Sequence, residues 1–373
     1  MQSQSKSKYF LIAIAFVFFA LLVWYLKTIV LYIIVSIILS LIGHPIVNFY
    51  SKIKVFKKHI PNTISSVLAL FTLIGVIALL VSLFIPLVIQ EARIISKINP
   101  NEVVSAFQQP LHNLEFDLQK FQITSEGGQS IEKMAVSKLT SVFGFQEVSS
   151  YAQLIISFFG SILAAIFSIA FITFFFLKEP KIIPNIIMLL TPPKHSQSVK
   201  NIMHNIKSTL TRYFIGILLD MAFVATLTAI GLSLLGIKNA LLIGLFAGIF
   251  NVIPYLGPLL GAGFAILIGI SSNLNLDFYT QLLPLTGKIA LTFLIIQLID
   301  AMFFQPLVIS NTVKAHPLEI FLVILTAGTL AGISGMVVAI PIYTILRIIA
   351  KQFLSRFKFV QELTSELEAK SNK

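Results

Sequence analysis

The sequence has no cysteine and few charged residues. None of its 373 residues is cysteine, which excludes disulfides, iron–sulfur clusters and cysteine-ligated zinc. Charged residues make up 11% of the chain and tryptophan occurs once, whereas hydrophobic residues make up 57%. A chain this poor in charge cannot cover the surface of an ordinary soluble protein. The composition therefore excludes a soluble protein and directs attention to membrane spans.

The motifs of several enzyme classes are missing as well. The sequence contains no His-Glu-x-x-His, no Gly-x-Gly-Asp, no Gly-x-Ser-x-Gly and no Walker phosphate-binding loop. These absences argue against a metalloprotease, an aspartyl protease, a serine hydrolase and an ATP-driven pump. We expect no enzymatic activity, no metal site and no cofactor, so that transport would be coupled to an ion gradient or passive.

Long apolar runs dominate the chain instead. An apolar helix of about 18 or more residues crosses the hydrocarbon core of a bilayer, which is about 30 Å thick. Such runs predict an all-α polytopic membrane protein. The first run follows a basic start and no cleavage site, so we interpret it as a retained signal-anchor helix. The predicted spans are 9–26, 28–43, 63–90, 151–177, 213–235 and 285–305.

The net charge of +12 is concentrated in short loops between the spans, which argues against nucleic acid as a partner. Segment 44–60 has no acidic residue, and 178–212 has only Glu179. Segment 91–150 has more acidic than basic residues. The positive-inside rule therefore predicts cytoplasmic N- and C-termini and places 91–150 outside. We expect 91–150 to form helices that pack on the outer face of the protein, or that join subunits or gate access.

Two further apolar regions, 239–271 and 318–350, are interrupted by glycine and proline. The first breaks at "IPYLGPLLGAG" and the second at "TLAGISGM". Two half-length helices joined by such a turn predict a re-entrant hairpin, whose backbone must be buried in protein or line a wet cavity. Two very short spans, or two kinked helices, are the alternatives.

A shift of the sequence by 80 residues aligns these regions. Asp220 then falls on Asp300, and Ala247-Gly248 falls on Ala327-Gly328. Each half consists of one span with an aspartate followed by one hairpin, and a single crossing between them gives the halves opposite orientations. Inverted repeats with broken helices are typical of secondary transporters. We divide the chain into six parts. The N-terminal transmembrane helices occupy 1–90, an extracytoplasmic helical segment occupies 91–150, and a span with a cytoplasmic amphipathic linker occupies 151–212. The two repeats, each a span followed by a hairpin, occupy 213–271 and 285–350, and 351–373 is a cytoplasmic tail.

Few ionisable residues lie within the spans. A carboxyl inside a membrane helix is costly unless it faces a cavity, a cation or a partner, so Asp300 and Asp220 are candidates for binding a cation or proton. Capping or bonding to a neighbouring broken helix is the alternative role. Gln297 lies one helical turn before Asp300, and Asn251 at the first hairpin tip could satisfy freed backbone groups or contact the solute. His316 is more typical of a structural or interfacial position than of a proton relay.

The segments "NVIPYLGPLLGA" (251–262) and "DAMFFQPLVISNTVKAHPLEIFLVILTAGTLAGISGMVVAIPIYTILR" resemble the two signatures of the AI-2E (autoinducer-2 exporter-like) transporters. The resemblance covers essentially the whole chain. It implies a bacterial inner-membrane protein in a family named for export of autoinducer-2, some of whose members are described as sodium or lithium/proton antiporters. It also implies a homo-oligomer, with a pentamer as one candidate. The matching positions are Asn251, Pro254, Tyr255, Gly257, Pro258, Asp300, Pro306, His316, Pro317, Gly332, Gly335 and Pro341.

Two departures from the family pattern remove polar groups from the expected pathway. Met302 stands where family members often have asparagine, and Gly216-Ile217 stands where a Gly-Gln pair is common. A particular substrate therefore does not follow from the resemblance. We expect a secondary transporter of a small solute, such as an autoinducer-2-like signal, or a cation/proton antiporter for Na⁺ or Li⁺. Alternating access would proceed through the two hairpins. Membrane lipid is expected as a further partner. A non-transporting scaffold oligomer and a passive channel are the alternatives.

Overall fold

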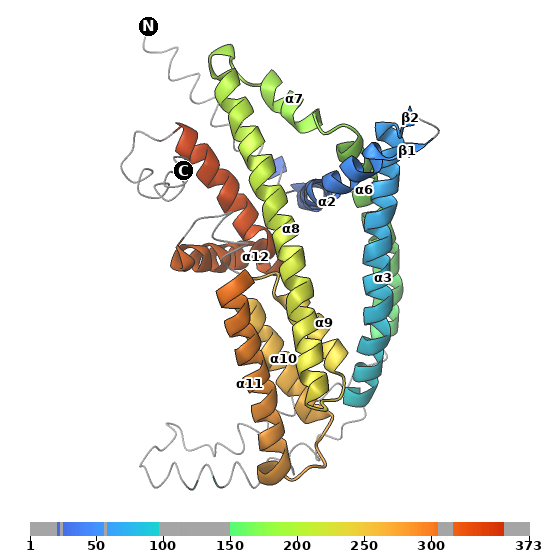
Figure 1. Cartoon of the computed structure of the whole chain (residues 1–373), viewed down its shortest axis with the longest axis vertical. Helices are drawn as coiled ribbons and strands as arrows, with labels where there is room; N and C mark the ends of the chain where they lie inside the picture. The colour runs from blue at the N-terminus through green and yellow to red at the C-terminus, as the bar shows by residue number, and fades with distance from the viewer. Residues whose placement is uncertain are drawn as a thin grey trace. The chain divides into compact units, whose positions relative to one another are not determined.

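The computed structural model describes residues 21–22, 25–55, 58–96, 113, 116, 150–304 and 316–353. Among these residues, five helices are long and apolar enough to cross a membrane, or six if a pair bent at residues 179–181 counts as one span. The prediction of an all-α polytopic membrane protein is therefore confirmed (Figure 1). Contacts divide the chain into one unit of residues 1–76 and 152–200 and a second unit of 77–151 and 201–373.

In the first unit, three long helices pack around a small buried cluster of apolar side chains. These are α2 (Lys27–Lys52), the start of α3 (Asn62–Ser96) and α6 (Ser150–Lys178), followed by the short helix α7 (Ile182–Leu189) and the 3₁₀ turn η1 (Pro193–His195). Strands β1 (Lys54–Val55) and β2 (Lys58–His59) form an antiparallel ladder between α2 and α3, with Lys54 opposite His59. Val47, Ala69 and Leu177 form the buried cluster between the three helices.

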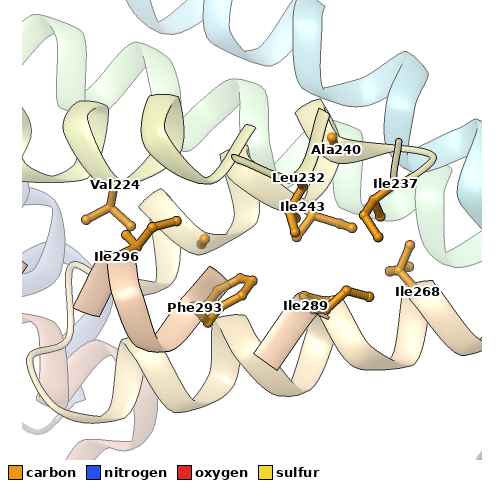
Figure 2. Packing of buried hydrophobic residues seen from close by; sticks show 11 residues of the cluster. Val224, Leu232, Ile237, Ala240, Ile243, Ile268, Ile289, Phe293 and Ile296 are labelled. Carbon is orange, nitrogen blue, oxygen red and sulfur yellow. The ribbon is translucent and has the colours of Figure 1, made fainter. Parts of the chain in front are cut away.

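The second unit holds the two broken regions and the larger core. Its helices are the end of α3, most of α8 (Ser196–Leu234), α9 (Ala240–Phe250), α10 (Leu256–Ser271), α11 (Leu283–Ile299) and α12 (Pro317–Phe353), with π-helical turns η2 (Phe278–Leu282) and η3 (Asp300–Phe304) at the two ends of α11. Figure 2 shows the apolar side chains that α8, α9, α10 and α11 bury against one another, among them Val224, Ile243, Ile268, Ile289 and Phe293. This packing fixes the position of the first broken region against its neighbouring helices.

Residues 239–271 fold as a helical hairpin, which we call hairpin 1. Its arms are α9 and α10, which are too short to be full spans and which pack on each other. Tyr255 has φ 67° and ψ −44°, and the N–H of Leu256 donates to the carbonyl oxygen of Pro254 at 2.8 Å, so the turn is a strained γ-turn. A Cβ at Gly257 would lie 2.2 Å from the carbonyl oxygen of Phe250, so only glycine fits there. The Pro/Gly pattern thus predicted the turn, while re-entry from one side of a membrane stays a prediction.

Helix α12 also breaks and folds back, and we call it hairpin 2. The break lies at Ala331 (φ −139°, ψ 18°) and Gly332 (φ 61°, ψ −148°), of which the second is a conformation that favours glycine. Across this break the Tyr343 hydroxyl donates to the carboxylate of Glu319. The two arms on either side of Gly332 are therefore in contact.

Helix α8 is longer than its apolar run. It has 39 residues and begins at Ser196 rather than at residue 213, so the boundary that we drew at residue 212 lies inside the helix. The first part of α8 is polar on most positions and buries only Ile202 and Leu210, so it has no continuous apolar run to reveal it. Helix α7 lies within the part of 151–212 that we interpret as an amphipathic linker. The span predicted at 9–26 and segments 91–150 and 351–373 lie mostly or entirely outside the described residues.

Candidate functional site

The second unit brings together three of the polar residues predicted from the sequence. Asp220 lies within α8, Asn251 at the tip of hairpin 1, and Asp300 at the start of η3. The side-chain amide of Asn251 donates to Oδ2 of Asp220 at 2.9 Å. The carboxyl groups of Asp220 and Asp300 interact directly with each other. Residues far apart in the sequence thus form one cluster, which we call the carboxyl cluster.

All three members of the carboxyl cluster are buried. The exposed fractions are 9% for Asp220, 6% for Asn251 and 1% for Asp300. Two carboxylates in contact repel each other, and burial raises the cost of each charge. Such a pair is stable when it shares a proton or when a cation lies against it. The chemistry available to the cluster is therefore exchange of a proton or binding of a small cation.

Two glycines on α9 place Asn251 against α8. A Cβ at Gly248 would lie 2.5 Å from the carbonyl oxygen of Met221, and one at Gly244 would lie 2.5 Å from that of Ala225. Small residues four apart let helix backbones approach closely in membrane proteins. Met221 directly follows Asp220, so the close approach of α9 sets the distance between Asn251 and the carboxylate.

Asp300 is positioned by the end of α11 and by an aromatic contact. Its backbone N–H donates to the carbonyl oxygens of Ile296 and Gln297, and the chain then continues as the π-helical turn η3. The ring of Phe304, the last residue of η3, stacks on Phe223 of α8 with centroids 4.0 Å apart. This contact holds η3 against α8 next to Asp220. Single π-turns inside helices occur frequently at functional sites.

The tip of hairpin 1 also contacts hairpin 2. The rings of Tyr255 and Phe321 meet edge to face, with centroids 6.5 Å apart. Pro254 and Pro258 are half-buried on either side of Tyr255. The predicted hairpin residues therefore connect the carboxyl cluster to the first arm of α12.

Other predicted residues lie outside this cluster. Gln297 is half-buried, and its side chain makes no hydrogen bond with a residue that the structure describes. His316 is exposed, and its Nδ1 accepts the N–H of Leu318 at 3.2 Å, so it caps α12 where Pro317 begins the helix. Gly335 and Pro341 are buried in α12, whereas Gly332 is exposed. Pro306 lies outside the described residues.

Sequence reasoning missed Glu91. This residue belongs to α3, is 3% exposed and accepts the side-chain amide of Asn239 at 2.6 Å and the hydroxyl of Ser272 at 3.3 Å. Asn239 precedes α9 and Ser272 follows α10, so one carboxylate holds both arms of hairpin 1 at their base. The sequence places residue 91 at the start of the polar outer segment 91–150, where an acidic residue is ordinarily solvated, so nothing in the pattern indicates its burial.

A second polar cluster lies within hairpin 2. The bond from Tyr343 to Glu319 joins its two arms, and Arg347 lies one turn beyond Tyr343 on the same helix. Arg347 is buried and interacts electrostatically with Tyr343. The arms of each hairpin are therefore linked away from the turn by an acidic residue, which is Glu91 of α3 for hairpin 1 and Glu319 of α12 itself for hairpin 2.

Comparison with known proteins finds one family across nearly the whole chain. A family model described as "AI-2E family transporter" matches residues 12–355. "Putative transport protein YueF" of Bacillus subtilis is 26% identical over 360 residues, covering 96% of this chain and 92% of that protein. A "Putative transport protein" of Thermotoga maritima is 24% identical over 331 residues, covering 87% and 91%. "Putative transport protein YrrI" of Bacillus subtilis is 28% identical over 187 residues, half of each chain.

Proposed function

The chain belongs to the AI-2E family of transporters, and on that premise we propose that it is a secondary transporter whose carboxyl cluster couples solute movement to a cation or proton. Family membership supports a role in membrane transport and not in catalysis. The single observation that carries the proposal is the buried contact between Asp220 and Asp300, joined by Asn251 from a hairpin tip. A buried pair of carboxyls inside membrane helices is a functional candidate by default.

In this proposal the two hairpins re-enter the membrane and act as gates. Helix α9 ends at Phe250, with Asn251 as its C-cap, and α10 begins at Leu256, so opposite helix ends meet at the tip of hairpin 1. Half-helix ends carry partial charges that contact ions and polar solutes in transporters. Protonation of the carboxyl cluster, or cation binding to it, changes the bond that Asn251 makes to Asp220. Movement of hairpin 1 follows from that change.

The substrate that we propose is small and polar. An autoinducer-2-like signal is one candidate, and exchange of Na⁺ or Li⁺ for H⁺ is the other. The carboxyl cluster favours the second, because it offers anionic oxygens and no positive side chain among its three members. We also propose that the protein is a homo-oligomer in a bacterial inner membrane with both termini in the cytoplasm.

Flux measurements on purified protein in liposomes test this function. Na⁺, Li⁺ and H⁺ gradients are applied in turn, and ion and solute movements are followed for the wild type and for Asp300→Asn. This substitution preserves the shape of the side chain and removes its charge, so we expect gradient-driven exchange to fall at least tenfold. Asp277→Asn is the matched control, because Asp277 is an exposed carboxylate outside the cluster.

Three results would contradict the proposal. Unchanged exchange in Asp300→Asn would remove the carboxyl cluster from the coupling step. Ohmic currents that neither saturate nor depend on a counter-ion would identify a channel. Absence of any flux in protein that remains folded and assembled would favour a scaffold.

A further inference from the structure

The first unit gathers positive charge at one end. The side-chain amide of Asn62, at the start of α3, donates to the carbonyl oxygen of Lys178, the last residue of α6, at 2.8 Å. The β1–β2 hairpin leads into α3 at this point, so its lysines lie at the same end as the end of α6 (Figure 1). The exposed or half-exposed lysines that follow α2, line this β-hairpin and flank α7 are Lys52, Lys54, Lys58, Lys178, Lys181 and Lys194.

Little negative charge offsets these lysines. Segments 44–61 and 178–212 contain one acidic residue, Glu179, whose carboxylate lies 3.7 Å from Nζ of Lys178. Lys178 also lies over the ring of Phe175, 6.0 Å from its centroid. Glu179 therefore offsets the charge of one lysine, and Lys181 and Lys194 leave net positive charge at the two ends of α7.

Helix α7 combines this charge with exposed apolar side chains. Its axis is bent by 77° from that of α6, so if α6 crosses a bilayer, α7 lies close to the plane of the membrane surface. None of its residues is buried. Leu189 and the following Leu190 are 87% and 80% exposed. Lys181 precedes the helix and Lys194 follows it, so positive charge flanks the apolar stretch on both sides.

We propose that α7 and the lysines around it form a binding surface for anionic phospholipids. The leucines insert among the acyl chains at the headgroup boundary, and the lysines contact the phosphates of anionic headgroups. A lipid surface fits this helix better than a protein partner does. In a bilayer the acyl chains lie directly beneath the phosphates, and on α7 exposed leucines lie between lysines in the same way. The inference stands apart from the transport function, since it concerns residues outside the carboxyl cluster.

Tryptophan fluorescence in nanodiscs tests the proposal on the full-length chain. The chain has one tryptophan, Trp24, so Trp24→Phe gives a background without tryptophan, to which Leu189→Trp adds a single reporter. The nanodiscs contain phosphatidylcholine and phosphatidylglycerol at fixed mole fractions, and one or the other lipid carries brominated, quenching acyl chains. We expect stronger quenching when phosphatidylglycerol is brominated. Each lysine near an anionic surface changes lipid affinity by about fivefold, so Lys181→Gln with Lys194→Gln should remove most of the preference.

Two controls make the result specific. Lys238→Gln removes an exposed lysine that lies between α8 and α9 and should leave the preference unchanged. A reporter at Leu234→Trp, an exposed position at the far end of α8, should show no preference for either lipid. Far-UV circular dichroism and gel filtration confirm that the variants remain folded.

Two quenching results would overturn the proposal. Equal quenching by both lipids at position 189 would overturn the selectivity for anionic headgroups. No quenching by either lipid would show that α7 is covered by protein or water and would overturn the lipid surface altogether.

Discussion

A methyl group added at Gly248 should separate hairpin 1 from the carboxyl cluster. In Gly248→Ala the new Cβ would lie 2.5 Å from the carbonyl oxygen of Met221 and 2.8 Å from Cβ of Ala225. An ordinary van der Waals contact begins at 3.4 Å, so α9 must move away from α8 by about 0.9 Å at this point. The obstacle is a backbone oxygen within a helix, which cannot rotate away as a flexible side chain would.

This displacement reaches Asn251, which lies one helical turn beyond Gly248. The bond from its amide to Asp220 measures 2.9 Å and would lengthen to about 3.8 Å, which is too long for a hydrogen bond. Loss of a hydrogen bond to a charged or shared carboxyl group costs about 1.5–3 kcal/mol. We therefore expect Gly248→Ala to lower the free energy of unfolding by about 2 kcal/mol and to reduce gradient-driven exchange in liposomes.

Thermal unfolding in detergent, followed by far-UV circular dichroism, measures the first effect, and the flux assay measures the second. Gly263→Ala is the matched control, because Gly263 lies in the other arm of hairpin 1 and a Cβ there would meet no atom within 4 Å. Alanine is favoured over glycine inside a helix by about 0.5–1 kcal/mol, so this control should be neutral or slightly stabilising. If both variants unfold and transport alike, the close approach of α8 and α9 does not set the geometry of the carboxyl cluster.

Three further predictions concern the polar contacts of the second unit. Glu91→Ala leaves the half-buried amide of Asn239 without its acceptor and should cost about 1–3 kcal/mol, measured by thermal unfolding, whereas Glu91→Gln keeps one acceptor oxygen and should cost less. Tyr343→Phe removes the hydroxyl that donates to Glu319 and should lower the unfolding temperature, while Tyr25→Phe, at an exposed position, should not; equal melting of the two would refute the role of this bond. The hydroxyl and the backbone N–H of Thr280 donate to Asp277 and hold the pKa of its carboxyl below the ordinary value. Because the folded pKa is the lower one, this contribution is present above about pH 4 and is lost as the pH falls through the folded value, so the difference in unfolding temperature between wild type and Asp277→Asn should shrink in acid.

The sequence predicted the helices best where a continuous apolar run marks them. Continuous apolar runs marked α3, α6 and α11, and the glycine and proline residues marked both hairpin turns, because few other residues fit at Gly257 or Gly332. The polar start of α8 was missed, since a helix that buries only an occasional residue has no apolar run.

The candidate site was predictable in its members but not in its contacts. Asp220, Asn251 and Asp300 stood out because each is polar within an apolar stretch, yet nothing in their spacing along the chain shows that the two carboxyls meet. Their contact depends on the packing of α9 on α8 and of Phe304 on Phe223, which are tertiary features. Glu91 was missed because it lies where the apolar run ends, and an acidic residue at that position is ordinarily exposed to solvent, whereas in the structure it is buried. The inverted orientation of the two repeats stays a prediction.

Helix α8, which carries Asp220, is longer than the hydrocarbon core of a bilayer is thick. Thirty-nine residues span about 58 Å, nearly twice the hydrocarbon thickness of a bilayer. Asp220 lies about 21 Å from the Leu234 end and about 36 Å from the Ser196 end. A rigid tilt of about 10° around Asp220 would therefore swing the Ser196 end through about 6 Å. In the proposed transport cycle, such a tilt would turn a small change at two carboxyl groups into a larger displacement at the Ser196 end of α8.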